Sequence, residues 1–375
     1  MADPKKYRFL FSIALFSGNS TYFGNMRDIV STMDDIEATW VPIEWNPAEW
    51  YVRIPPISFN WSVKGGLVTR NRVRLLEQSG KRFDAALFHH QMLPLWLFDF
   101  RKRVPTIITT DATPALHEAY GKWYHKLQSS RIWGVGKVKK HFTRSVYTDA
   151  EYILPFSDWV KNSLVNEYRV AENKICVIPP GINFTLWNNA PDRAIDAASR
   201  PFTVLFVGGQ FLRKGGDLLA AIAATEEFKD VHFNFVTQEF IGQPPPNITV
   251  HQHVQPNSSI MRELYRTADV FMRPTRADFH SWVSLEAMAM ELPVITTDVG
   301  AMREIVDDGK SGFIVPVNDV AAMVDRLRRL RADAGLRLAF GKAGRMIVEQ
   351  KFNLHRNIEK TISLMKLAAD KRRRS

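Results

Sequence analysis

Short apolar runs alternate with segments of amphipathic, helical pattern along the whole chain. Nearly continuous apolar runs between such segments are typical of parallel sheets that helices cover on both faces. The first half is therefore predicted to form an α/β domain of the Rossmann type. Its expected strands are residues 7–16, 84–89, 104–110, 151–156 and 174–180.

The alternation stops at residues 183–200, which are polar and rich in Ala, and resumes with PFTVLFVGG at 201–209. Such an interruption between two regular segments is typical of an interdomain linker. The expected strands of the second half are residues 202–207, 231–236, 269–274, 293–297 and 312–316. Its expected helices lie near residues 215–228, 258–267, 282–290, 319–332 and 355–369.

These patterns predict two Rossmann-like domains joined by one linker. We expect an N-terminal domain at 1–182, the linker at 183–200, a C-terminal domain at 201–352, and a helix with a basic tail at 353–375. Ligands bind open parallel sheets at the carboxyl ends of the strands. A binding cleft is therefore expected between the two domains.

The composition is that of an ordinary globular protein, with 45% hydrophobic and 24% charged residues among 375. Cys176 is the single cysteine, and no Cys and His residues have zinc-ligand spacing, so we expect no disulfide and no structural metal. A cytoplasmic protein fits this pattern. The first apolar run is too short for a signal peptide and is expected to be a buried strand. No stretch reaches the roughly 18 to 20 apolar residues of a membrane span.

The net charge of +11 has two local sources. Residues 121–145 contain seven cations and no acid, and residues 371–374 contain four cations, so the rest of the chain is neutral overall. This distribution argues against a nucleic-acid-binding surface. Segment 121–145 also contains aromatic residues. It either contacts an anionic membrane or a phosphate-bearing acceptor, or it is a solvated helix face. The tail is expected to be disordered.

The segment at 273–316 carries the strongest chemical pattern. A buried strand leads into a loop and then a helix that is expected to begin at Ser281, a good capping residue. The free N–H groups at a helix start suit a phosphate or a polar sugar. Asp278 lies in the loop and Glu286 lies eight residues later in the helix. These acids either contact two parts of one ligand or are a capping acid and a partly buried helix acid.

Residues 286–316 contain EAMAM, PVITT and GAMREIVDDGKSGFIVP. This segment resembles the donor-site signature of retaining glycosyltransferases with the GT-B fold, particularly glycosyltransferase family 4. Residues 204–219 and 156–183 resemble other segments of the same family. The resemblance covers most of 150–352 and is weaker in 20–150, where acceptors bind in such enzymes. It implies two Rossmann-like domains whose parallel sheets face each other across a cleft, with the last helix crossing back to the first domain.

The resemblance also implies roles for two cations and the glycines beside them. Lys214 and Arg213 stand where the family holds the donor diphosphate, and fixed cations there would stabilise the leaving group without a metal ion. The alternative is a cation pair that faces solvent. Gly209 replaces the family's usual Arg, so Arg213 is expected to supply that charge. Gly208, Gly209, Gly215 and Gly216 would allow close approach of the backbone.

By the same resemblance, Glu286 is expected to bind the ribose hydroxyls of the donor nucleotide, and Asp278 to lie near the transferred sugar. Asp278 is one methylene shorter than the family's usual Glu. The family's glycines between the two acids are also absent, so the sugar pocket must differ. The backbone N–H groups there belong to Phe279, His280, Ser281 and Trp282.

Two positions in the first domain are further candidates. Gly18 lies in the loop after the first strand. This loop is either one that approaches the diphosphate or the acceptor, as in relatives, or a plain strand-to-helix turn. Asp111 follows a buried strand and either orients the acceptor and stabilises charge at the anomeric carbon, or caps a helix. His89, His90 and His117 are also candidates, although a single histidine is more often structural.

The sequence thus predicts a retaining glycosyltransferase that needs no metal or cofactor and acts in carbohydrate biosynthesis. It would move a sugar from a nucleotide diphosphate sugar to a hydroxyl of a glycan, a lipid-linked or a small-molecule acceptor. The alternative is a non-catalytic nucleotide-sugar or membrane-surface binding protein with a decayed site. The expected location is the cytoplasm, with or without peripheral contact at the inner face of the membrane. Donor base, donor sugar, acceptor and oligomeric state are not specified by the sequence.

Overall fold

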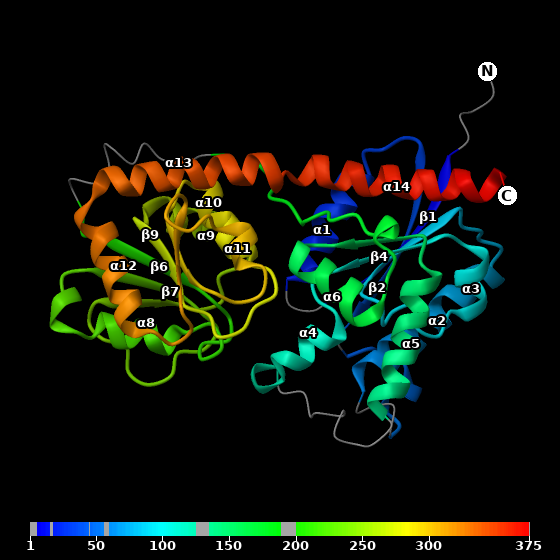
Figure 1. Ribbon diagram of the computed structural model, residues 1–375, viewed down its shortest axis with the longest axis horizontal. Helices are drawn as coiled ribbons and strands as arrows, with labels where there is room; N and C mark the ends of the chain where they lie inside the picture. Colours follow the sequence, from blue (N-terminus) through cyan, green and yellow to red (C-terminus); the bar gives the residue numbers. More distant parts are fainter. Residues whose placement is uncertain are drawn as a thin grey trace. The chain divides into compact units, whose positions relative to one another are not determined.

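The computed structural model describes residues 6–15, 18–44, 46–55, 60–124, 135–188 and 200–374, with the backbone alone at 135–139. The chain divides into two units, Met1–Pro180 with His355–Ser375 (unit 1) and Gly181–Leu354 (unit 2). Figure 1 shows that each unit is built around its own sheet, with helices packed against it. Residues 189–199 of the expected linker lie outside the described residues, so the linker and its boundaries stay predictions.

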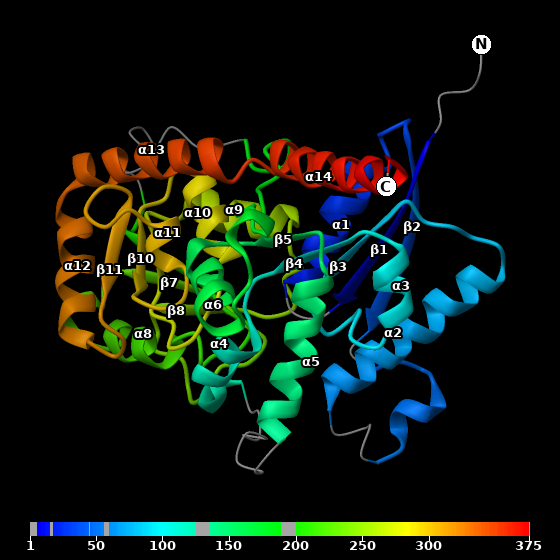
Figure 2. The same cartoon turned by 45° about the vertical axis from the view of Figure 1, so that its right-hand side comes forward.

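Unit 1 contains a five-stranded parallel sheet in the order β2-β1-β3-β4-β5, which Figure 2 shows from one side. All five residues of β3 and of β4 are buried, as expected for strands covered on both faces. The strands are β1 (Tyr7–Leu15), β2 (Ile36–Glu44), β3 (Ala85–His89), β4 (Thr106–Thr110) and β5 (Tyr152–Pro155). The helices are α1 (Asn19–Val30), α2 (Trp61–Gln78), α3 (Phe98–Arg103), α4 (Pro114–Ala119), α5 (Val135–Asp149), α6 (Asp158–Tyr168) and α14 (Leu354–Arg374), with 3-10 turns η1 (Trp50–Arg53), η3 (Gly121–Trp123) and η5 (Glu172–Lys174).

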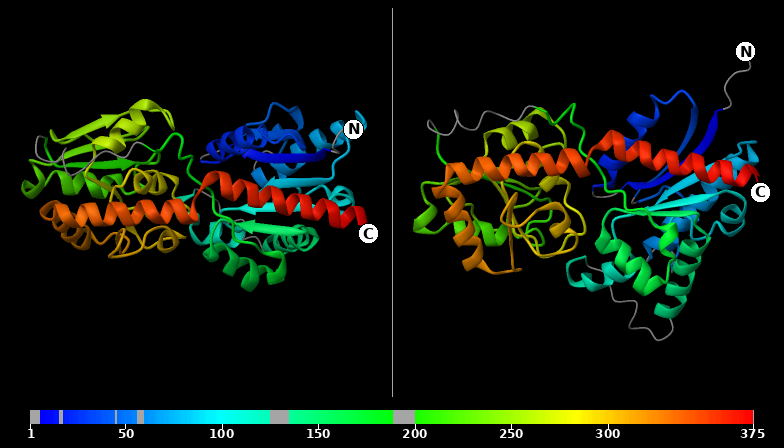
Figure 3. Two further views of the ribbon diagram at one scale, coloured as in Figure 1. Left: turned by 90° about the horizontal axis from the view of Figure 1, so that it is seen from above. Right: turned by 45° about the horizontal axis from the view of Figure 1, so that its top comes forward.

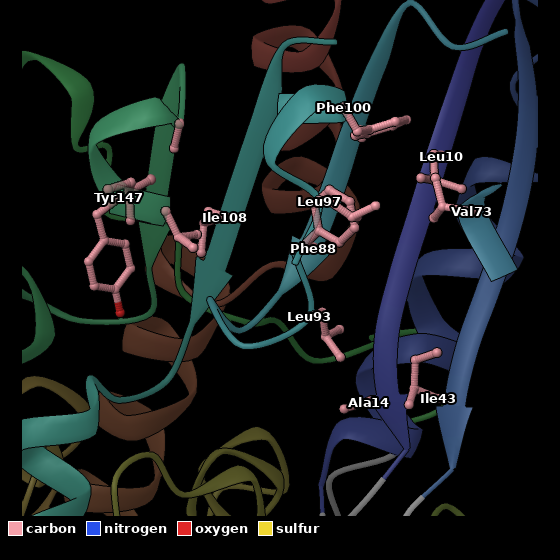
Figure 4. Packing of buried hydrophobic residues seen from close by; sticks show 14 of the residues in the cluster. Leu10, Ala14, Ile43, Val73, Phe88, Leu93, Leu97, Phe100, Ile108 and Tyr147 are labelled. Carbon is pink, nitrogen blue, oxygen red and sulfur yellow. The ribbon is translucent and has the colours of Figure 1, made fainter. Parts of the chain in front are cut away.

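The core of unit 1 lies between this sheet and its helices. Leu10, Phe88 and Ile108 come from three neighbouring strands, and Figure 4 shows them with Phe100 of α3 and Tyr147 of α5. Each of these side chains is almost completely buried. Burial of a large apolar side chain contributes about 2 kcal/mol, so these layers hold the strand ends in fixed positions.

Helix α14 (red in Figure 3) runs alongside the strands of unit 1, and its last turns reach the amino-terminal edge of the sheet. Its side chains pair with acids that immediately precede three strands: Lys366 with Asp35 at 2.5 Å, Arg373 with Asp84 at 3.2 Å and Lys371 with Glu151 at 2.6 Å. The expectation of a disordered tail was therefore wrong for residues 371–374, because these ion pairs extend the helix to Arg374.

Unit 2 contains a six-stranded parallel sheet in the order β11-β10-β9-β6-β7-β8. The strands are β6 (Thr203–Val207), β7 (His232–Val236), β8 (Ile248–His251), β9 (Val270–Arg273), β10 (Val294–Thr297) and β11 (Gly312–Val315). The helices are α8 (Gly216–Ala223), α9 (Ser259–Thr267), α10 (Trp282–Ala289), α11 (Met302–Ile305), α12 (Val320–Ala332) and α13 (Ala334–Lys351), with the 3-10 turn η6 (Glu226–Phe228). The two parallel sheets confirm the predicted α/β class.

Three segments differ from the sequence prediction. The expected strand at 174–180 is not regular: the N–H groups of Cys176 and Ile178 donate to β5, but only Ile175 forms a bridge, and Pro179 and Pro180 have no N–H to continue it. Strands β2 and β8 were not expected, because neither is a continuous apolar run.

No helix within the described ranges is both long enough and apolar enough to cross a bilayer. Within the basic segment 121–145, residues 125–134 lie outside the described residues, and α5 begins at Val135.

Candidate donor site and a second polar cluster

The strand order of unit 2 places its site. The chain moves from β6 to β7 and β8 on one side of the sheet and then returns to β9 on the other side of β6. In open parallel sheets, a crevice forms at the carboxyl ends of the two strands where the order reverses. Lys214 follows β6 and Asp278 follows β9. The topology therefore brings together two residues that are 64 positions apart.

Lys214 and Asp278 form a buried ion cluster with Arg273, the last residue of β9. Lys214 Nζ lies 2.9 Å from Asp278 Oδ2, and an Arg273 Nη atom pairs with the same oxygen. The three residues are only 8%, 7% and 4% exposed, respectively. When Lys214 is protonated, two cations and one carboxylate leave one excess positive charge in a water-poor environment, where an anionic ligand gains most from it.

The pKa directions agree with this charge arrangement. Burial alone would raise the pKa of Asp278, but Arg273 and Lys214 outweigh burial and hold that pKa well below its usual range. The pKa of Lys214 is lowered well below its usual value by burial and then by Arg273, although Asp278 opposes this shift. Asp278 is therefore ionised, and an added anion would favour the charged form of Lys214.

Arg273 was not among the predicted site residues. Its position at the end of an apolar run gave the only signal, a charged residue in an otherwise buried strand. Its other Nη atom donates to Ser281 Oγ, so the side chain connects β9, the following loop and the start of α10. Arg273 thus fixes the geometry of the cluster as well as its charge.

Arg213 lies beside the cluster but is bound differently. Its Nη1 donates to the carbonyl of Ala277 at 2.8 Å, its Nε donates to Gln210, and its own carbonyl accepts from Arg276 N at 2.8 Å. These contacts tie the turn after β6 to the loop after β9. The half-buried Arg213 also contributes positive potential at Lys214 and Asp278.

The glycines of the turn after β6 have unequal roles. Gly215 has φ of +79°, and a Cβ built there would lie 2.1 Å from the carbonyl oxygen of Pro274. A Cβ on Gly216 would overlap the ring of Phe211, and one on Gly208 would press on Lys214. At Gly209 the nearest neighbour is Gln238 at 3.9 Å. Gly215 is therefore required by the backbone itself, whereas the space at Gly209 is open.

Helix α10 begins as predicted, with Ser281 as its cap. Ser281 Oγ accepts from Ser284 N at 3.2 Å, so the capping role that was one alternative for Asp278 belongs to Ser281. Asp278 Oδ1 instead accepts from Phe279 N at 3.1 Å. His280 is buried in the same loop, and burial lowers its pKa to about 4. Phe279 is also buried, whereas Trp282 is half-buried.

Glu286 is buried on α10 and is held by a tyrosine that sequence reasoning missed. The hydroxyl of Tyr265 on α9 donates to Glu286 Oε2 at 3.0 Å. Burial raises the pKa of Glu286 to about 7, against the opposing effects of Tyr265 and Arg273. The rings of Trp187 and Phe271 pack on Tyr265, with centroid distances of 5.3 and 5.9 Å. A fully buried tyrosine near a helix acid gave no distinct sequence signal.

Unit 1 has a second polar cluster at its own reversal point, between β1 and β3. Gly18 caps α1 with ordinary helical torsions, so its own backbone does not require glycine, and its role toward a ligand stays a prediction. The next residue, Asn19, lies between two histidines, 3.1 Å from His89 Nε2 and 3.2 Å from His90 Nε2. Asp111 directly follows β4, and its Oδ1 lies 3.6 Å from His90 Nδ1. His90 and Asp111, both sequence candidates, therefore lie together.

The third histidine candidate is His117. It lies on α4, where its ring packs against Tyr124 with a centroid distance of 5.8 Å. Thr113, rather than Asp111, caps this helix by accepting from Leu116 N. Asp111 is therefore not the cap of α4, which was the alternative role expected for it.

Both units match family models of glycosyltransferases. Residues 201–333 match the family model described as glycosyl transferases group 1, and residues 38–186 match the model described as glycosyltransferase family 4. The capsular polysaccharide biosynthesis glycosyltransferase CapM of Staphylococcus aureus is 26% identical over 230 residues, which cover 54% of this chain and 57% of CapM. The chain thus spans a little over half the length of such curated relatives.

Solved structures extend the likeness in fold to nearly the whole chain. The sucrose-phosphate synthase of Thermosynechococcus elongatus superposes with a TM-score of 0.76 at 15% identity, covering 96% of this chain and 99% of that one. The Anabaena protein HepE, solved in complex with UDP and glucose, gives 0.69 at 13% identity with 96% and 99% coverage. The fold is therefore the GT-B fold.

The unequal glycines of the turn can be separated by substitution. Gly215→Ala is expected to lower the free energy of unfolding by roughly 3 kcal/mol, because the side chain would be strained at positive φ and would overlap the Pro274 carbonyl. The matched variant Gly209→Ala is expected to change it by less than about 1 kcal/mol. Urea unfolding measures both values. Equal losses would contradict the assignment of the close approach to Gly215.

The raised pKa of Glu286 predicts a pH-dependent stability. Its carboxyl is protonated more readily in the folded protein, so its contribution is fully present below the unfolded pKa of about 4.5 and is lost as pH rises through about 7. Between these values the wild type is expected to lose roughly 3 kcal/mol relative to Glu286→Gln. Urea unfolding at a series of pH values measures the difference, and parallel profiles for the two proteins would refute it.

Proposed function

We propose that this chain, which belongs to the family 4 and group 1 glycosyltransferases, catalyses transfer of a sugar from a nucleotide diphosphate sugar to an acceptor hydroxyl with retention of configuration. The buried cluster of Lys214, Arg273 and Asp278 carries this proposal. Its excess positive charge lies at the reversal point of the sheet, where such folds bind their ligands. A diphosphate is the part of the donor that matches this charge.

The donor is proposed to bind unit 2. Lys214 and Arg213 would contact the diphosphate, with Arg273 behind them, and the backbone at Gly208 and Gly209 would approach it closely. Glu286 would accept hydrogen bonds from the ribose hydroxyls. The N–H groups of the loop at 279–282 would hold the sugar or phosphate oxygens.

Charge stabilisation is the main chemical contribution of these residues. The leaving diphosphate gains negative charge as the glycosidic bond breaks, and fixed cations lower that barrier. Asp278 Oδ2 is shared by two cations, which suits it to orientation rather than to nucleophilic attack. We therefore propose same-face reaction, in which the leaving phosphate helps to deprotonate the acceptor. Because side chains supply the positive charge, no divalent cation is proposed to be required, and turnover in excess EDTA tests this.

The acceptor is proposed to bind unit 1, near Asp111. Its class, whether glycan, lipid-linked or small molecule, stays open. Peripheral contact of residues 121–145 with an anionic membrane also stays a proposal; in the described part of this segment, the Lys140 ammonium lies 5.8 Å from the ring of Tyr168.

A ligand screen tests the function and the ribose assignment together. Thermal stabilisation should single out one of the uridine, guanosine, adenosine and thymidine diphosphates, because a ligand of the folded state raises the melting temperature. In the wild type, the 2′,3′-dideoxy form of that nucleotide should bind about tenfold more weakly than the parent nucleotide. In Glu286→Gln, the dideoxy form should bind no more weakly than the parent nucleotide. Calorimetry measures the affinities. Equal discrimination by both proteins would remove Glu286 from the ribose site, and binding without turnover of any nucleotide sugar would favour the non-catalytic alternative.

Removal of the central cation should damage turnover. Lys214→Ala is expected to lower kcat about a hundredfold, the size of effect seen when one positioned charge-stabilising donor is lost. Lys229→Ala, which removes an exposed lysine from the same unit, serves as the control and should be unaffected. Release of the nucleoside diphosphate from the donor is the measurement. Unchanged kcat in a folded Lys214→Ala protein would exclude Lys214 from the reaction.

A further inference from the structure

The polar cluster of unit 1 forms a relay that ends at Asp111. We infer that Asn19 and His90 are positioning residues, which hold the Asp111 carboxylate in place to accept a hydrogen bond from a hydroxyl of a sugar ligand. The inference deepens the proposed function and rests on it, because it specifies how unit 1 would bind a polyhydroxyl group. Neither Asn19 nor the pairing of His90 with Asp111 follows from the sequence pattern alone.

The geometry of Asn19 determines which ring nitrogens carry protons. Its Nδ2 can only donate, so His90 Nε2 at 3.2 Å must accept, and the proton of a neutral His90 lies on Nδ1. Its Oδ1 can only accept, so His89 Nε2 at 3.1 Å must carry a proton. His89 Nδ1 then accepts from the Thr109 hydroxyl at 2.9 Å. The two adjacent histidines therefore adopt opposite tautomers.

The charge of Asp111 favours this arrangement over the one in which the Asn19 amide is reversed. If the Asn19 amide were reversed, His90 would carry its proton on Nε2 and would present an unprotonated Nδ1 to the carboxylate 3.6 Å away. A lone pair facing a carboxylate is unfavourable, whereas an N–H facing it is attracted. The distance is longer than a hydrogen bond by roughly 0.5 Å, so a small closure would form one.

The surroundings hold the relay fixed. His89 is completely buried, and burial followed by the proximity of His90 lowers its pKa well below the usual value, so it stays neutral. The rings of Tyr22 and Phe156 pack on His89 at centroid distances of 4.9 and 5.4 Å. Burial raises the pKa of Tyr22, so its phenol is neutral too. Among the described residues, Asp111 is a charged group that faces His90, with its Oδ1 3.6 Å from His90 Nδ1.

The backbone of His90 is in a conformation that side chains rarely adopt. Its φ is +80°, while its N–H donates to the Thr109 carbonyl at 2.8 Å. Strained backbone of this kind persists where the surrounding structure imposes it, and it is concentrated at functional sites. Here it directs the imidazole toward both Asn19 and Asp111.

Exposure gives the relay a direction. The side chain of His90 is 3% exposed, whereas that of Asp111 is 25% exposed. The carboxylate is therefore the end that a ligand can reach, and His90 lies behind it. A carboxylate held from behind by an N–H loses little freedom when it accepts a sugar hydroxyl, which is how preorganisation improves binding and orientation.

Nitrogen-15 NMR of the histidine side chains tests the relay without any substrate. At neutral pH the wild type should show His89 as the Nε2–H tautomer and His90 as the rarer Nδ1–H tautomer. His90→Asn assigns the signal, and His355→Asn, at an exposed position on α14, is the matched control. In Asn19→Asp the amide donor is gone, so His90 Nε2 must carry a proton and the neutral Nδ1–H signal should disappear. A wild-type His90 in the Nε2–H form would overturn the inference, whether or not Asn19→Asp folds.

Turnover tests the positioning role. The donor of highest turnover among UDP-glucose, UDP-N-acetylglucosamine, GDP-mannose, ADP-glucose and dTDP-glucose is used, with water and, in parallel, free glucose as the acceptor. Asn19→Asp should lower kcat about tenfold and leave the donor KM within twofold. Loss of the tautomer signal with unchanged kcat would refute the positioning role. Absence of turnover with every donor would remove the proposed function and that role with it, while the NMR spectra would still decide whether the relay exists.

Discussion

Two cations that share one buried carboxylate oxygen determine the character of unit 2. Burying a charge is costly unless it is paired, and Lys214, Arg273 and Asp278 pair with one another while leaving one positive charge in excess. Burial and Arg273 disfavour the charged form of Lys214, so an anion that enters the crevice would both be attracted by the cluster and stabilise that charged form. The surrounding contacts of Arg213, Ser281 and the glycine turn serve mainly to hold this cluster in position.

The same topological feature explains both polar clusters. In each sheet the strand order reverses once, next to the first strand of the unit, and the carboxyl ends of the two strands at that point open a crevice. Unit 2 fills it with a charged cluster, whereas unit 1 fills it with Asn19, His89 and His90 and adds Asp111 from the next strand. Helix α14 pairs with residues at the amino ends of the strands of unit 1, the edge opposite its polar cluster.

Several parts of the site could be predicted because their cause is local. Ser281 is followed by a helical pattern, and its hydroxyl caps that helix. Buried strands such as β3 and β4 are continuous apolar runs. The tail at 371–374 failed as a prediction because its order comes from acids at Glu151 and Asp84, which are remote in sequence. The prediction of a strand at 174–180 failed because Pro179 and Pro180 lack the N–H groups that regular pairing needs, and the apolar pattern takes no account of this.

The sequence by itself determined the two-sheet α/β fold and placed Lys214 and Asp278 beside a strand end or a helix start and Glu286 inside the following helix, because periodicity and capping act over a few residues. Only the tertiary structure decided which of these groups touch. Arg273 became part of the cluster through the neighbouring positions of β6 and β9, Tyr265 reached Glu286 from another helix, and Asn19 came between His89 and His90 across 70 residues. Burial and charge pairing depend on such long-range contacts, so the pKa shifts and the orientation of the site exist only in the folded chain.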